Sequence, residues 1–141
     1  MKTRYSSLVN VKKNIMQKSE RLLQSKNSAL SNAKNALETS INALQEIQAP
    51  KNGIIADFLS SRALLDAARS LIKHNEEWKA FASKEVESAK EQLKRDMIEY
   101  EKYQYLELQE IEAIKRKEKR KVAKELDEVA LIAFSSKERS A

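Results

Sequence analysis

The chain's one proline and one glycine, Pro50 and Gly53, lie within four positions of each other. Proline ends a helix because it has no N–H to donate, and it disfavours helical geometry at the residue before it. Asn52 and Gly53 tolerate backbone conformations that most residues avoid. A chain with no other proline or glycine has few tight turns, so we expect one reversal, at residues 49–53, between two long helices.

The first helix is predicted over about residues 5–48 from an unbroken heptad repeat. Two apolar series run side by side at intervals of seven, with Lys, Ser, Asn, Gln and Glu between them. A continuous apolar seam of this length must pack against a second helix. The first series is Val9, Met16, Leu23, Leu30, Leu37 and Leu44; the second is Leu8, Ile15, Leu22, Ala29, Ala36 and Ala43.

The second helix is predicted over about residues 54–137, because heptad spacing resumes after the turn. One series is interrupted only by Lys79, and the series three positions further on is interrupted by Asn75 and Asp96. Small alanines in the second series favour close packing against the leucines of the first helix. The two series are Phe58, Leu65, Ile72, Val86, Leu93 and Tyr100, and Ala68, Ala82, Ala89 and Tyr103.

These patterns predict an all-α fold: two long helices that form an antiparallel coiled-coil hairpin, with the second helix longer, in a single domain over residues 1–141. A tight turn would place Leu44 near Leu59, and Leu23 near Lys79 and Ala80. Residues 54–97 would then partner the first helix, and the segment beyond them would lack an internal partner and either bind another protein or stay partly frayed. A second reversal at residues 73–79, giving a three-helix bundle, is the alternative, although no turn residue marks it.

The net charge of +6 hides a sharp division near the C-terminus. Residues 99–112 carry five acids and one base, whereas residues 115–124 carry seven bases and one acid. The acidic segment would repel a phosphate backbone, and no aromatic residue alternates with the basic ones to stack on bases. We therefore expect no nucleic-acid partner. The basic segment is interpreted as a solvated helix face or a docking surface for an acidic protein.

The composition gives no support for catalysis. The single histidine, His74, has polar neighbours; there is no cysteine, and one glycine cannot form a phosphate-binding loop. Carboxylates on a two-helix hairpin face solvent, whereas acid–base catalysis needs a concave, partly desolvated site. We predict a non-enzyme with no catalytic, cofactor-binding or metal-binding residues and no cofactor. No apolar run has the roughly 18–20 residues of a membrane helix, which favours the cytoplasm.

Three stretches together resemble the FliJ family of the bacterial flagellar type III export apparatus. The start, "YSSLVNVKKNIMQKSERLLQSKNSAL", combines an aromatic residue with Leu8, Val11, Glu20 and Leu23. The segment "NGIIADFLSSRALL" places an aromatic–leucine pair after the turn, and "RKEKRKVAKELDEVA" runs from a charged helix into "LDEVA". The order of these stretches and the chain length make the resemblance more specific than any one stretch.

The resemblance implies a stalk-like coiled coil that lies at the cytoplasmic base of the export machine, peripheral to the inner face of the cell membrane through its partners only. The implied partners are the export ATPase hexamer, the cytoplasmic domain of the export gate, and export chaperones. By analogy with rotary ATPase stalks, both termini would enter the ATPase ring. The residues expected to bind the gate are Phe58, Leu59 and Arg62, and those expected to bind the ATPase are Arg116, Lys117, Arg120, Lys121, Leu126 and Asp127.

Two alternatives stay open at this point. The chain is also compatible with a generic coiled-coil scaffold that oligomerises through its unpaired half-seam, and with a related injectisome stalk protein. The export interpretation expects a monomer in the absence of partners, whereas a scaffold expects an oligomer.

Overall fold

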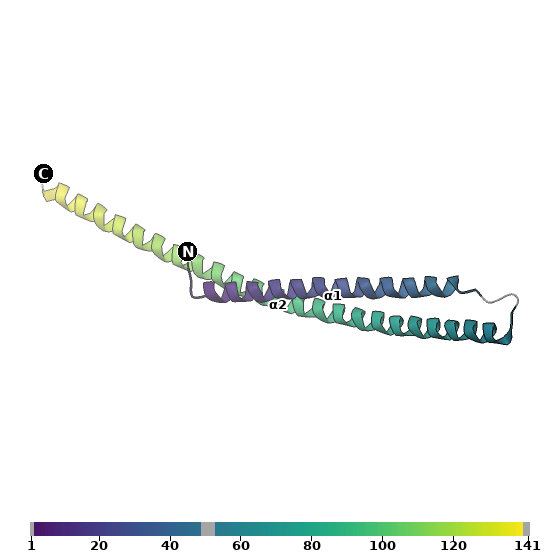
Figure 1. Ribbon diagram of the computed structural model, residues 1–141. Coiled ribbons are helices and arrows are strands. Elements are labelled where there is room, and N and C mark those ends of the chain that lie inside the picture. The colour runs from purple at the N-terminus through teal and green to yellow at the C-terminus, as the bar shows by residue number, and fades with distance from the viewer. Residues whose placement is uncertain (1, 49–52, 140–141) are drawn as a thin grey trace. The chain divides into compact units, whose positions relative to one another are not determined.

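Two α-helices make up the computed structural model, which describes residues 2–48 and 53–139. Helix α1 spans Ser6–Glu46 and helix α2 spans Ile55–Arg139, and the described residues contain no strand. The two helices run in opposite directions, so the predicted all-α hairpin with a longer second helix is confirmed (Figure 1). Of the predicted turn, Ala49, Pro50, Lys51 and Asn52 lie outside the described residues.

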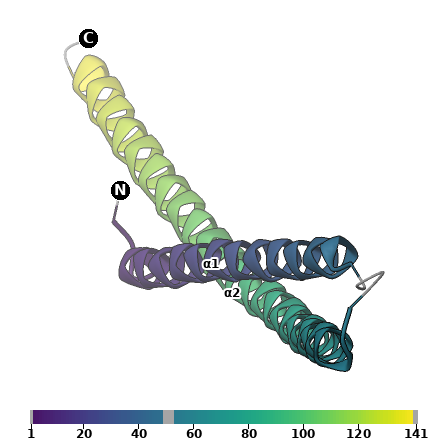
Figure 2. The same ribbon diagram turned by 45° about the vertical axis from the view of Figure 1, so that its right-hand side comes forward.

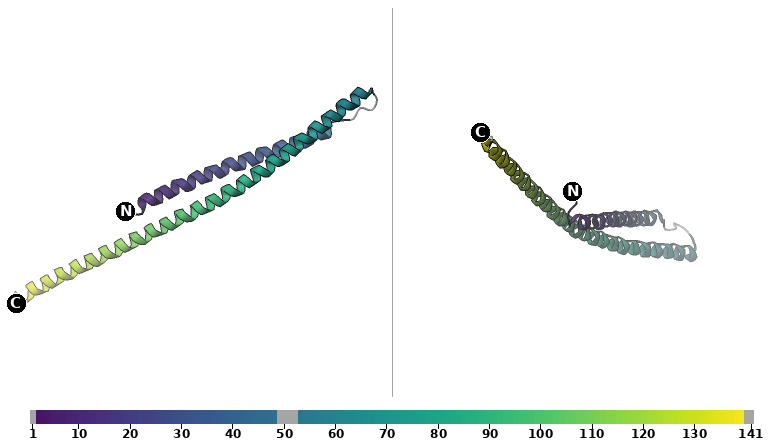
Figure 3. Two further views of the ribbon diagram at one scale, coloured as in Figure 1. Left: turned by 90° about the horizontal axis from the view of Figure 1, so that it is seen from below. Right: turned by 90° about the vertical axis from the view of Figure 1, so that its left-hand side faces the viewer.

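Contacts divide the hairpin into two compact units. The central unit comprises Ile15–Asp96, and the terminal unit comprises Met1–Asn14 together with Met97–Ala141. Each unit contains a segment of α1 packed against a segment of α2, as the further views show (Figure 3). The prediction of a single domain is not tested by this division and stays a prediction.

Helix α1 begins at a reciprocal cap formed by Thr3 and Ser6. The Thr3 hydroxyl accepts a hydrogen bond from the Tyr5 N–H (3.1 Å), and the Ser6 hydroxyl accepts one from the Thr3 N–H (2.8 Å). These bonds satisfy donors that a helix N-terminus otherwise leaves unpaired. The helix ends with the Ile47 N–H bonded to the Leu44 carbonyl (3.2 Å), which tightens its last turn.

Helix α2 continues without a break from Ile55 through residues 73–79 to Arg139 (Figure 2). The three-helix alternative is therefore wrong. Gly53, just before α2, has a φ outside the left-handed region. A side chain there would lie 2.7 Å from Asp57 Oδ2, so this glycine allows the Asp57 carboxylate to fold back over the start of the helix.

The first predicted series of α1 faces α2, and the second largely does not. The residues from Val9 to Leu44 in the first series are all at least half-buried, whereas Leu8, Ile15 and Leu22 are 40–46% exposed. The other inward positions of α1 lie three residues after the first series, and most of them are polar or small. They are Lys12, Ser19, Lys26, Ala33, Ser40 and Ile47.

The predicted seam of α2 is confirmed except at its first residue. Phe58 is 47% exposed, whereas Leu65, Ile72, Val86 and Leu93 are buried or half-buried. The core is narrow and contains mainly alanines and one valine, since two helices alone bury little surface. Its most buried apolar residues are Ala33 (0% exposed), Ala82 (4%), Val86 (4%) and Ala89 (5%).

The polar interruptions of the α2 seam are paired with polar residues of α1. Asn75, 6% exposed, donates hydrogen bonds to the Ala36 carbonyl and the Ser40 hydroxyl, both at 3.2 Å. The Ser19 hydroxyl donates to the Asp96 carboxylate. A buried polar group without a partner destabilises a fold by about 1–3 kcal/mol, so these pairs favour one alignment of the helices over its neighbours.

The predicted register is wrong by about ten residues, or nearly three helical turns. Ser19 contacts Asp96 and Lys26 lies 3.0 Å from Glu85, so Leu23 lies across from about residue 90 and not from Lys79. The prediction assumed a tight turn. In the structure, Ile47 and Gln48, which follow α1, lie beside the first turns of α2 and share a shallow hollow with Ser60, Ser61 and Leu64.

Because of this difference in register, α1 packs against a longer part of α2 than the predicted residues 54–97. Half-buried residues of α2 continue beyond residue 97 as far as Ile114, and the side chains of residues 115–138 are all exposed. The segment expected to lack a partner therefore begins about 17 residues later than the tight turn implied.

The alanine layer allows a direct test of the seam. The register places Ala33 across from Ala82, so Ala33→Leu would overfill this layer and lower the free energy of unfolding by about 1–3 kcal/mol. Urea unfolding followed by circular dichroism measures the effect. Ala43→Leu, the same change at an exposed position of α1, is the control and is expected to change little. Equal losses in both variants would contradict the seam.

Candidate functional site

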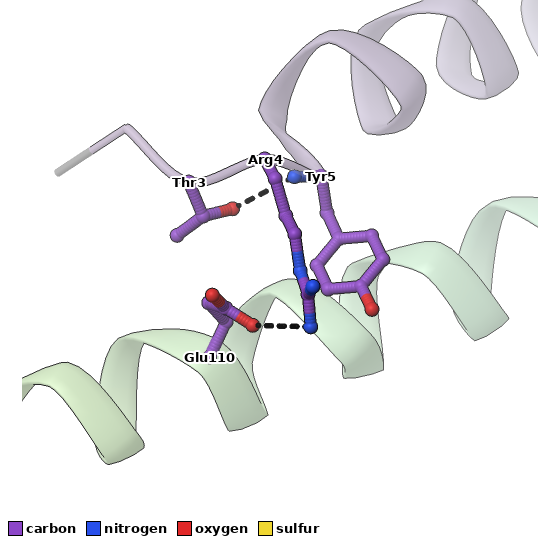
Figure 4. Close-up of polar contacts among 4 residues, drawn as sticks. All are labelled: Thr3, Arg4, Tyr5 and Glu110. Atoms are coloured by element: carbon purple, nitrogen blue, oxygen red, sulfur yellow. Dashed lines mark hydrogen bonds and ion pairs between the residues drawn. The ribbon is translucent and has the colours of Figure 1, made fainter.

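The N-terminus of α1 is held against the acidic segment of α2, within the terminal unit. Arg4 forms an ion pair with Glu110 (3.3 Å), and the Arg4 guanidinium lies over the Tyr5 ring at 5.0 Å (Figure 4). The Ser6 hydroxyl donates to Glu107 (3.0 Å), and the Lys12 ammonium lies 3.8 Å from Glu99. Three of the five acids in residues 99–112 are thus paired with residues at the N-terminal end of the hairpin.

The basic half of the charge pattern, residues 115–124, differs from the acidic half in this respect. Arg116, Lys117, Arg120 and Lys121 are exposed, and among residues 2–48 and 53–139 no carboxylate lies within ion-pair distance of any of them. Arg116, Lys117 and Arg120 line a shallow hollow with Ala113. We call these four residues, Arg116, Lys117, Arg120 and Lys121, the cationic face.

The cationic face overlaps the continuation of the seam. Successive helical residues are about 100° apart, so the side of α2 that meets α1 continues past Ile114 as Lys117 and Lys121. The seam side therefore becomes basic where α1 no longer covers it. Of the other two residues predicted for this site, Asp127 lies on the side of the cationic face, but Leu126, 63% exposed, lies on a different side of the helix.

The residues predicted to form the second site lie on the first turns of α2, in the central unit. Phe58 is 47% exposed, Leu59 is 62% exposed, and Arg62 is exposed. Helical spacing puts all three on the side opposite the hollow occupied by Ile47. The structure therefore brings these three together on an open face.

Two residues of this face were missed by the sequence analysis. Ile54 is 70% exposed and Ile55 is 78% exposed, directly before Phe58. Single exposed apolar side chains are common on protein surfaces, but here four large ones lie within six residues. Apolar patches of this kind usually mark interaction sites. The sequence feature that could have revealed them is the pair Ile54 and Ile55 next to the turn, which belongs to neither heptad series of the second helix. We call Ile54, Ile55, Phe58, Leu59 and Arg62 the tip face.

The part of the chain that the structure describes was searched for metal-binding clusters and for membrane-spanning helices. No group of three or more His, Asp or Glu side chains there could hold a metal ion. Neither described helix contains a stretch sufficiently long and apolar to span a bilayer. His74 is exposed on α2.

A comparison with protein-family models identifies the family. The model described as "Flagellar FliJ protein" matches residues 1–139 of this 141-residue chain. The chain belongs to the FliJ family. The resemblance seen in the sequence is thereby confirmed, and membership assigns the chain a role related to flagellar protein export. A search of curated proteins and a search of solved structures gave no significant match.

The change in packing at Ile114 predicts a boundary in amide hydrogen exchange. Helical hydrogen bonds of residues 115–138 are covered by no part of α1, so their amides are expected to exchange faster than those of residues 65–114. Exchange of the free chain followed by mass spectrometry measures this difference. A boundary near residue 97 would favour the tight-turn register, and uniform exchange along α2 would contradict the packing described here.

Proposed function

We propose that this FliJ-family chain is a non-enzymatic, stalk-like coiled coil that links the export ATPase ring, the export gate and export chaperones. In this proposal it lies in the cytoplasm, at the inner face of the cell membrane, and reaches the membrane only through its partners. The observation that carries the proposal is the cationic face, which is charged, exposed and unpaired within the described residues.

The cationic face supports contact with the ATPase because it offers two guanidinium groups and two ammonium groups on one side of a helix. Arginine binds carboxylates with two parallel hydrogen bonds, and lysine adds charge that can rearrange. An acidic lining inside a ring of ATPase subunits would complement this face. Such electrostatic complementarity speeds association and fixes orientation, and added salt weakens it.

The tip face supports contact with the gate through different chemistry. Ile54, Ile55, Phe58 and Leu59 are apolar and exposed, with Arg62 at their edge. A partner that covers this face removes apolar surface from water, which contributes about 25 cal/mol per Å² of buried apolar area. The chaperone contact follows from the resemblance alone and is assigned to no surface.

The ATPase contact is tested by charge reversal on the cationic face. Lys117→Glu combined with Lys121→Glu is expected to weaken binding to the ATPase hexamer at least tenfold, since it places carboxylates where the partner's carboxylates lie. Binding is measured by surface plasmon resonance at two salt concentrations. The matched control is Lys90→Glu with Lys94→Glu, which has the same residue types, spacing and charge change on the same helix. Equal weakening in both would mean that net charge alone governs binding.

The gate contact is tested by truncating the tip face. Phe58→Ala with Leu59→Ala is expected to reduce affinity for the detergent-solubilised export gate by about tenfold or more, because large apolar anchors dominate such interfaces. Phe81→Ala with Leu71→Ala removes the same two side-chain types from exposed positions elsewhere on α2 and serves as control. Undiminished gate binding by the tip variant would show that the gate binds another surface.

A further inference from the structure

A second heptad stripe runs along α2 in the terminal unit and faces away from α1. Its members are spaced alternately three and four residues apart over about 50 Å of helix, and every one of them is exposed. We call it the outer stripe. It consists of Ile98, Glu101, Tyr105, Leu108, Glu112, Lys115, Lys119, Val122, Leu126, Val129 and Ala133.

The outer stripe is separate from the seam with α1. The residues of α2 that face α1 in this unit include Tyr100, Tyr103, Glu107 and Ile114, all half-buried. Helical spacing puts the outer stripe about 150° around α2 from them. It is also separate from Lys117 and Lys121, from which it is about 150° away at the level of Lys119.

The outer stripe carries large apolar side chains at both ends. Ile98, Tyr105 and Leu108 are 54–61% exposed, and Val122, Leu126 and Val129 are 54–63% exposed. Alternating spacing of three and four residues is the pattern by which one helix packs against another in a coiled coil. The stripe therefore fits a helix.

The charges of the stripe indicate which helix it fits. Acids, Glu101 and Glu112, occupy the N-terminal half, and bases, Lys115 and Lys119, begin the C-terminal half. A parallel pair of such helices in register would set like charges against each other. In an antiparallel pair of identical helices, Glu112 of each copy lies beside Lys115 of the other copy. The stripe is complementary to itself only in the antiparallel orientation, the arrangement of a two-fold symmetric dimer.

We infer that two copies of this chain associate through their outer stripes, as antiparallel helices related by a two-fold axis between residues 113 and 114. The alternation of three and four residues then sets Ile98 across from Val129 of the second copy, and Tyr105 across from Val122. Glu112 lies across from Lys115, next to the axis. Leu108 lies across from Lys119, whose methylene chain covers it.

This association is reversible, because the stripe is narrow and its centre is charged. Of the ten layers, four pair apolar with apolar residues, and the two central layers pair a carboxylate with an ammonium group that water partly screens. The other four set Leu108 across from Lys119 and Leu126 across from Glu101. The free chain is therefore in a monomer–dimer equilibrium, and not the monomer expected from the sequence. This dimer forms whether or not the cationic face and the tip face bind the partners proposed for them.

The equilibrium is measured by sedimentation of the full chain over a dilution series. The wild-type chain is expected to dissociate from dimer to monomer on dilution. Lys115→Glu with Lys119→Glu sets these positions against Glu112 of the second copy, so its dissociation constant is expected to rise at least tenfold. Lys117→Glu with Lys121→Glu, on the opposite side of the same turns, is the matched control and is expected to match wild type. Circular dichroism checks that each variant remains helical.

A mixing experiment tests the pairing itself. Glu112→Lys alone is also expected to weaken self-association, because the introduced ammonium group would face Lys115 and Lys119 of the second copy. When the Glu112→Lys chain is mixed with the Lys115→Glu, Lys119→Glu chain, every central contact joins opposite charges, so a mixed dimer is expected to form. A wild-type chain that stays monomeric at all concentrations, or a mixture that stays monomeric, would overturn the inference.

Cysteine cross-linking decides the orientation, and the natural chain has no cysteine to interfere. Tyr105→Cys and Val122→Cys chains, mixed and oxidised, are expected to form a disulfide between the two chains. Tyr105→Cys alone is expected not to cross-link, because antiparallel packing holds the two copies of residue 105 about 25 Å apart. Efficient cross-linking of Tyr105→Cys to itself would overturn the antiparallel arrangement.

Discussion

The alignment of the two helices depends on polar side chains inside an otherwise small and apolar seam. Asn75 bonds to Ser40 and to the Ala36 carbonyl, and Asp96 accepts from Ser19. Leucines and alanines repeat every seven residues, so sliding one helix by a heptad would preserve much of the apolar packing. It would not preserve these hydrogen bonds, because the serines would move away from their partners. Apolar burial stabilises the hairpin, and the polar pairs select its register.

The register in turn determines what the chain presents to other molecules. Because half-buried residues of α2 continue as far as Ile114, one side of the acidic segment lies against the N-terminal part of the hairpin, where Glu99, Glu107 and Glu110 pair with Lys12, Ser6 and Arg4. The basic segment that follows is left without a carboxylate partner among the described residues. A shorter overlap would have exposed both segments, and their opposite charges would have weakened the field of each. The alignment thus pairs three of the five acids of residues 99–112 within the hairpin and leaves the basic residues 115–124 exposed.

The sequence predicted the helices and the seam of α2 because heptad periodicity shows which residues share a face. It could not predict the register, because periodicity is unchanged by a shift along the partner, and the polar positions Asn75 and Asp96 were interpreted as interruptions. The sequence also could not show which of the two apolar series of α1 faces α2. Leu8, Ile15 and Leu22 are as periodic as Val9, Met16 and Leu23, yet only the latter face α2. The apolar Ile54 and Ile55 escaped notice because they belong to no heptad.

The last part of α2 is exposed on all sides because no part of α1 covers it. Most of the stability of a helix in a protein comes from the packing of one of its faces, so this segment gains order from whatever packs on it. The cationic face suits an acidic partner, and the outer stripe suits a helix of opposite charge order. Leu126, assigned from the sequence to the same site as Arg116 and Arg120, lies instead in the outer stripe. Helical spacing therefore separates the surface proposed for electrostatic docking from the surface proposed for self-association, and each can be changed by substitution without touching the other.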